Sequence, residues 1–92
     1  MIKTVVITKS ARKDLAGLPR AIVAKFATWV GMVETNGLEE VRKIQGFHDE
    51  PLKGKRKGQR SIRLSKSHRA FYIVVEDEVY FAEVQEVNNH EY

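Results

Sequence analysis

The fold of this chain is decided by residues 61–84, which read SIRLSKSHRAFYIVVEDEVYFAEV. Ile62 and Leu64 alternate with polar residues, which is the period-two pattern of a half-buried strand. Arg69 to Val75 is a more continuous apolar run, and it is predicted to be a central strand. An acidic turn at residues 76–78 then leads into the return strand of a hairpin. Consecutive strands with short connections predict a mostly antiparallel sheet.

The segments before this sheet are predicted to be one strand and several helices. The β-branched run from Ile2 to Thr8 reads as an opening strand. Ser10 is expected to cap a short helix that stops at Gly17. Pro19 stands where a second helix begins, because its fixed φ suits a first helical turn. Apolar residues of that second helix recur every three or four positions and are assigned to the core: Ile22, Val23, Phe26, Trp29, Val30 and Val33. A further helical turn is expected over residues 38–44.

This order of elements predicts one α+β domain that covers residues 1–92. An N-terminal strand and two to three helices would pack on one face of the mostly antiparallel sheet. The other face is expected to stay open, with basic side chains on or beside it. A length of 92 residues suits one domain with a thin core. The hydrophobic fraction of 42% and the charged fraction of 30% are typical of an ordinary globular chain.

Composition excludes several classes of protein. A net charge of +4 and a pI near 9.5 favour an anionic partner. Cysteine is absent, which rules out disulfides and thiolate metal sites. The histidines His48, His68 and His90 lack a short metal-ligand spacing, so we expect no metal and no cofactor. The N-terminus shows no secretion signal, and no apolar run approaches the roughly 20 residues of a membrane span. These features lead us to expect a cytoplasmic protein without membrane contact.

Positive charge is concentrated between Lys53 and Arg69, where eight residues are Lys or Arg and none is acidic. Gly54 and Gly58 interrupt this segment, as in a loop shaped to bind a polyanion. The candidate RNA-binding residues are Lys53, Lys55, Arg56, Lys57 and Arg60. The alternative is a solvated basic loop that only improves solubility.

A second set of residues has the chemistry of a metal-free ribonuclease. Its members are Glu50, Arg63, Arg69, His90 and Tyr92. In such an enzyme a general base deprotonates the ribose 2′-OH, cations stabilise the phosphorane, and a general acid protonates the leaving 5′-oxygen. Arginine suits the middle role because its planar fork holds two phosphate oxygens at once.

Each of these residues also has an ordinary explanation. Residues 46–51 are predicted to form a loop, and a glutamate before a proline in such a loop is usually an exposed acid. The two strand arginines could form salt bridges with Glu83 or Glu86 across the sheet. His90 and Tyr92 could be only the end of a frayed tail.

The same residues carry a resemblance to a known family. Glu-Pro-Leu-Lys-Gly begins at Glu50, Gly-x-x-Ser-x-Arg ends at Arg63, and His-Arg-x-x-Tyr ends at Tyr72, with a histidine and a tyrosine near the C-terminus. This string resembles the RelE/ParE superfamily of bacterial type II toxins. It is most similar to the ribosome-dependent mRNA endonucleases of the YoeB and HigB kind, and the resemblance covers essentially the whole chain. A RelE-like fold is implied.

The resemblance implies a role for each residue of the set. Glu50 would be the general base, and Arg63 and Arg69 would bind phosphate, with Arg69 at the scissile group. His90 would be the general acid, and Tyr92 would orient or stack on a base. In YoeB-like toxins the C-terminal histidine and tyrosine are adjacent, whereas here Glu91 separates His90 from Tyr92. Which of the two donates the proton therefore stays open.

Partners and alternatives also follow from the resemblance. It implies that the basic loop contacts messenger RNA in the ribosomal A site or ribosomal RNA, and that a cognate antitoxin protein covers or distorts the site. A ParE-like member would instead poison DNA gyrase and would have no nuclease site. A third hypothesis is an inactive module that binds only RNA or the antitoxin.

Overall fold

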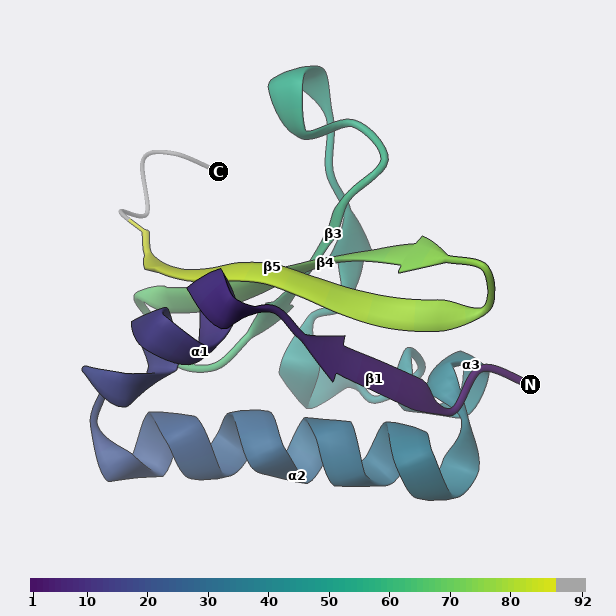
Figure 1. Cartoon of the computed structure of the whole chain (residues 1–92), viewed down its shortest axis with the longest axis horizontal. Coiled ribbons are helices and arrows are strands. Elements are labelled where there is room, and N and C mark those ends of the chain that lie inside the picture. The colour runs from purple at the N-terminus through teal and green to yellow at the C-terminus, as the bar shows by residue number, and fades with distance from the viewer. Residues whose placement is uncertain (88–92) are drawn as a thin grey trace.

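The computed structural model describes residues 1–87, so His90 and Tyr92 lie outside the described residues (Figure 1). The elements are β1 (Thr4–Ile7), α1 (Lys9–Ala16), α2 (Arg20–Asn36), α3 (Leu38–Val41), β2 (Glu50–Pro51), β3 (Arg60–Arg63), β4 (His68–Val75) and β5 (Glu78–Glu86), with 3-10 turns η1 at Gln45–Phe47 and η2 at Gly54–Arg56. The strands form one sheet in the order β1-β5-β4-β3-β2. The pair β1–β5 is parallel and the other pairs are antiparallel. The predicted α+β class and the central position of β4 are therefore confirmed.

Helices α1 and α2 lie on one side of the sheet, as predicted (Figure 1). The core between α2 and the sheet is built from aromatic rings. The Trp29 ring centroid lies 5.3 Å from that of Tyr72 and 5.3 Å from that of Phe81, and Phe26 meets Phe81 at 4.7 Å. All of these rings are buried, as is Val33, and Ile22 and Val30 pack partly buried against the core, so the assignment is correct for these α2 positions. None of the helices within residues 1–87 is long and apolar enough to span a bilayer.

Two local predictions were wrong. Helix α1 begins at Lys9, and its N-cap is Thr8 instead of Ser10. The Thr8 hydroxyl accepts a hydrogen bond from the Ala11 N–H and donates one to the Phe81 carbonyl oxygen, at 2.7 Å. The cap is thus held by the neighbouring strand, which local sequence does not reveal. The second error is the loop at residues 46–51, because it ends in the short strand β2.

A β-bulge in β5 changes which of its side chains face the helices. Tyr72 stands opposite Phe81 and Phe71 opposite Glu83, which leaves Ala82 as one extra residue in β5. Such an insertion shifts the alternation of side chains by one. Phe81 and Val84, three residues apart, are consequently both buried on the helix side. Glu83, by the same shift, lies on the opposite face beside Phe71.

The second face carries basic side chains, as expected, but it is covered at Phe71 instead of being open throughout. Phe71 points away from the helices, because its neighbours Ala70 and Tyr72 belong to the helix-side core. It is nevertheless only 1% exposed. The guanidinium of Arg56 lies 4.0 Å from the Phe71 ring centroid, and its Nη1 atom lies 2.7 Å from Oε1 of Glu83. The basic loop is therefore folded down onto this face of the sheet.

The aromatic core generates a stability prediction. Phe81→Ala should lower the free energy of unfolding by about 3–5 kcal/mol, because it removes a fully buried ring and leaves a cavity. Val74→Ala is the control, since Val74 is 37% exposed and should cost much less. Urea unfolding followed by tryptophan fluorescence measures both. Equal losses for the two variants would contradict the core as described.

Candidate functional site

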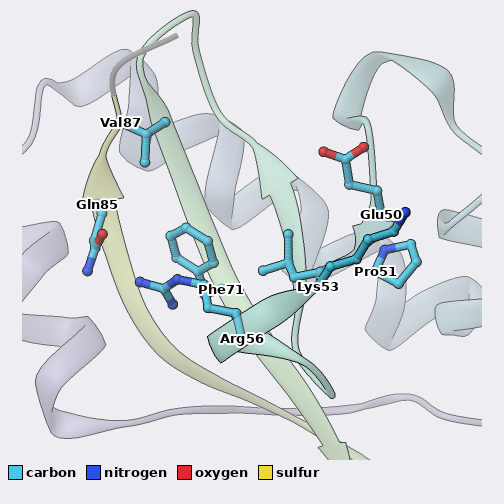
Figure 2. Close-up of a pocket in the computed structure, with 8 residues that line it drawn as sticks. Glu50, Pro51, Lys53, Arg56, Phe71, Gln85 and Val87 are labelled. Atoms are coloured by element: carbon cyan, nitrogen blue, oxygen red, sulfur yellow. The ribbon is translucent and has the colours of Figure 1, made fainter. Parts of the chain in front are cut away.

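A cavity of about 430 Å³ lies on the face of the sheet away from the helices (Figure 2). Its lining residues are Glu50, Pro51, Leu52, Lys53, Arg56, Phe71, Gln85 and Val87. They come from β2, the basic loop, β4 and the end of β5. Figure 2 shows the Arg56 guanidinium beside the Phe71 ring, with Gln85 and Val87 across from Lys53 and Glu50.

At the rim of this cavity the fold brings together two of the predicted catalytic residues. Oε1 of Glu50 lies 3.4 Å from Nη1 of Arg69, and the same nitrogen donates a hydrogen bond of 3.2 Å to the hydroxyl of Ser61. The register explains this contact, because Glu50 pairs with Ser61 on β3, and Arg69 lies on the next strand, β4. Pro51 is tolerated here because β2 is an edge strand.

The exposure of this pair suits acid–base chemistry on an anion. The Glu50 side chain is 48% exposed, so an incoming hydroxyl can reach it. The Arg69 side chain is 14% exposed, which keeps its guanidinium partly shielded from water. Arg63 stands opposite Arg69 in the strand register and on the same face, and its Nε donates to the Ser65 carbonyl oxygen at 3.4 Å. The Glu50 carboxylate and the Arg69 guanidinium are thus in contact, and Arg63 is the cross-strand neighbour of Arg69 on the same face.

The five predicted RNA-binding residues fall into two groups. Lys53, Lys55 and Lys57 are exposed on the basic loop. The two arginines instead make contacts inside the protein, Arg56 with Phe71 and Glu83 as described above. Arg60 donates from Nε to Oδ1 of Asp49 at 2.8 Å.

Arg60 also faces the other side of the sheet from Glu50. It alternates with Ser61 along β3 and stands opposite Tyr72, whose ring is in the helix-side core. Partial burial opposes the charged form of Arg60, but the hydrogen bond and the charge of Asp49 outweigh it and raise the pKa of the guanidinium. Burial, reinforced by a hydrogen bond to Asp49, raises the pKa of the Tyr72 hydroxyl. Tyr72 is therefore a neutral hydrogen-bond donor at physiological pH.

The described part of the chain ends at the cavity. Val87 lines it, and the Val87 N–H donates to the Ser67 carbonyl oxygen. The predicted residues His90 and Tyr92 follow but lie outside the described residues. No group of three or more His, Cys, Asp or Glu side chains within residues 1–87 is arranged to hold a metal ion.

Sequence reasoning missed several residues of the site. Ser61 was part of the quoted motif, but its hydrogen bond to Arg69 was not foreseen. Phe71 faces the cavity because it alternates with Ala70 and Tyr72 of the helix-side core, and Gln85 faces it because of the bulge at Ala82. A second cavity, of about 440 Å³ and lined by Arg42, Lys43, Ile44, Gln45, His48, Asp49 and Glu50, was also not foreseen. Glu50 lines both cavities. Its position before Pro51 was the feature of the sequence that drew attention to it.

Known proteins match this chain in structure and not in overall sequence. The sequence matches no protein-family model and no curated protein. A chain of the RelBE2 toxin–antitoxin complex from Mycobacterium tuberculosis superposes with a TM-score of 0.63 at 25% identity, over 90% of this chain and 95% of that one. The YoeB dimer from Staphylococcus aureus gives 0.70 at 19% identity, over 96% and 100%. A chain of the archaeal RelE–RelB complex from Pyrococcus horikoshii gives 0.72 at 20% identity, over 97% and 99%.

The chain therefore has the RelE-like toxin fold. Its neighbours among solved structures are RelE- and YoeB-type toxins of toxin–antitoxin systems, some of them in complexes with antitoxins. The resemblance to the RelE/ParE superfamily seen in the sequence is confirmed by this fold.

The three exposed loop lysines are predicted to bind the phosphate backbone of RNA. Binding of single-stranded RNA should weaken steeply with salt, and replacing Lys53, Lys55 and Lys57 by Gln should reduce the logarithmic salt slope by about 2, because each neutralised phosphate contributes about 0.7. Fluorescence anisotropy at several salt concentrations measures the slope.

The matched control has the same loss of charge on another surface. It replaces Lys3, which is exposed just before β1, and Lys9 and Lys13, which are exposed on α1. This variant should keep the slope of the unmodified protein. A loop variant with an unchanged slope would mean that the basic loop is only a solvated surface.

Proposed function

We propose that this protein is the toxin of a type II toxin–antitoxin system and acts as a ribosome-dependent mRNA endonuclease. The observation that carries the proposal is the contact between Glu50 and Arg69 at 3.4 Å, at the rim of a cavity bordered by a basic loop. A carboxylate beside a guanidinium is the minimum that a metal-free ribonuclease needs to move a proton next to a phosphate.

The reaction begins at the ribose 2′-OH of the nucleotide before the cleaved bond. The Glu50 carboxylate accepts the 2′-OH proton while the 2′-oxygen forms a bond to phosphorus. The guanidinium of Arg69 shifts its contact from Glu50 to the non-bridging phosphate oxygens, and Arg63 adds a second positive charge on the same face. Charge-assisted hydrogen bonds of this kind are stronger than neutral ones and strengthen as negative charge grows in the transition state.

The second half of the reaction breaks the phosphorus–oxygen bond on the 5′ side. His90 donates a proton to the leaving 5′-oxygen, or Tyr92 does so, and the products are a 2′,3′-cyclic phosphate and a 5′-hydroxyl. His90 follows Val87 by three residues, a length of chain that spans at most about 10 Å. Since Val87 lines the cavity, this length is compatible with a proton donor at the same phosphate. Tyr92 would orient or stack on a base.

The remaining charges define the partners. Lys53, Lys55 and Lys57 would contact ribosomal RNA or the message backbone in the ribosomal A site. A cognate antitoxin is proposed as the protein partner, in line with the toxin–antitoxin complexes among the structural neighbours.

Primer extension on mRNA from a translation reaction tests this function. The purified protein should cut messages at ribosome-occupied codons, and Glu50→Ala should lower cleavage by about 10²–10⁴-fold, the usual contribution of a catalytic base. Arg69→Ala should lower it by about 10²–10³-fold, as expected for one group that stabilises transition-state charge. Glu34→Ala is the control, because Glu34 is exposed on α2, on the helix side of the sheet.

The alternatives give different results in the same assay. Intact messages with translation unimpaired would favour the gyrase-poisoning reading or the binding-only module. Full cleavage by Glu50→Ala would remove Glu50 from the mechanism and leave the endonuclease assignment standing.

Metal dependence is tested on a minimal RNA substrate without ribosomes, which themselves need Mg²⁺. Because the proposed enzyme depends on the ribosome for full activity, only slow cleavage of this substrate is expected. That residual cleavage should persist in excess EDTA, because the proposed proton transfers use side chains alone. Mass spectrometry of the products should find the cyclic phosphate in both conditions. Loss of cleavage on chelation, restored by adding back the metal, would contradict the mechanism.

A further inference from the structure

Directly behind Glu50 lies a buried carboxylate that the proposed reaction does not use. The Asp49 side chain is 0% exposed. Its Oδ2 atom accepts a hydrogen bond of 2.6 Å from the hydroxyl of Tyr72, and its Oδ1 atom accepts one of 2.8 Å from Nε of Arg60. A buried carboxylate is costly unless it is paired and hydrogen-bonded, so these partners hold it in one arrangement.

Asp49 and Glu50 point to opposite faces of the sheet. Asp49 meets Arg60 and Tyr72, which lie on the helix side of β3 and β4. Glu50 meets Arg69 on the cavity side. Successive residues of an extended chain alternate in this way, so fixing the direction of one side chain fixes that of the next.

The backbone alone holds Glu50 weakly. Strand β2 has two residues, which pair with Ser61 and Arg60 at the edge of the sheet. One of the two is Pro51, which has no N–H to donate. Leu52, which follows, donates its N–H to the Gln59 carbonyl oxygen. The Asp49 side chain adds contacts to the two strands that also carry Ser61 and Arg69.

We infer that Asp49, held by Tyr72 and Arg60, is a positioning residue that keeps the Glu50 carboxylate against Arg69. Its catalytic consequence rests on the proposed function. This assigns Arg60 a role inside the protein, where the sequence led us to expect RNA binding.

Tyr72→Phe tests this inference with the smallest change. It keeps the ring that packs on Trp29 and Phe81 and removes only the hydroxyl. We expect kcat for cleavage of ribosome-bound message to fall by about 10- to 100-fold with KM unchanged, since a displacement of about 1 Å can cost that much. The control is Tyr80→Phe, which removes a hydroxyl bonded to Glu78 near the hairpin turn and should leave kcat unchanged.

A double-mutant cycle separates positioning from a general loss of folded protein. In a Glu50→Ala background, Tyr72→Phe should cause no further loss of the residual rate, because there is no carboxylate left to position. The same fold loss in both backgrounds, or an unchanged kcat in Tyr72→Phe alone, would overturn the inference.

NMR gives a readout that does not depend on activity. Nuclear Overhauser contacts between the Glu50 and Arg69 side chains should be present in the unmodified protein and in Tyr80→Phe, and should weaken in Tyr72→Phe. If the unmodified protein cleaves no RNA, the proposed function fails. The Overhauser contacts between Glu50 and Arg69 would then still show whether Asp49 positions Glu50. Contacts that persist in Tyr72→Phe would refute the positioning role.

Discussion

The packing of Tyr72 and Phe81 against Trp29 determines where the other side chains of the sheet lie. Once Tyr72 faces the helices, its neighbour Phe71 must face the opposite side, and so must Arg69. Because of the bulge at Ala82, the side chains of β5 follow the same two faces, with Val84 toward the helices and Glu83 away from them. One aromatic contact layer thus organises both the core and the cavity on the far face.

In the basic segment Arg56 and Arg60 make contacts within the protein, whereas the loop lysines are exposed. The chemistry of the two side-chain types explains this difference. Arginine combines a delocalised charge with a planar surface, and it stacks and pairs at partly buried positions. Arg56 does so on Phe71 and Glu83, and Arg60 does so with Asp49. The compact, strongly hydrated charges of the lysines remain at the surface. The contacts of Arg56 and Arg60 within the protein thus distinguish these two residues from the exposed lysines of the same segment.

The candidate site depends on a short edge strand, which is a fragile way to place a functional group. The RelE-like fold contributes the sheet on which Arg69 and Ser61 stand, but β2 has little backbone pairing of its own. Asp49 is buried beneath it and Glu50 is half-exposed above it. We interpret Asp49 as an anchor that holds the segment in place, while the Glu50 carboxylate above it remains accessible to a substrate.

Local patterns in the sequence determined much of this protein. Periodicity located the helix stripe of Phe26 and Trp29, the central strand and the hairpin, and so the α+β class. Residue chemistry singled out Glu50 and Arg69 as candidates for the site. These features could be predicted because they depend on neighbours within a few positions along the chain.

How these residues meet depends on contacts between strands that are far apart in the chain. The register of β2 on β3 sets the 3.4 Å contact of Glu50 with Arg69, and the bulge directs Glu83 toward Arg56. Asp49 gave no signal in the sequence, because its partners Arg60 and Tyr72 are 11 and 23 positions away. Contacts between distant positions depend on strand order and on which face each residue occupies, and these are properties of the folded sheet as a whole.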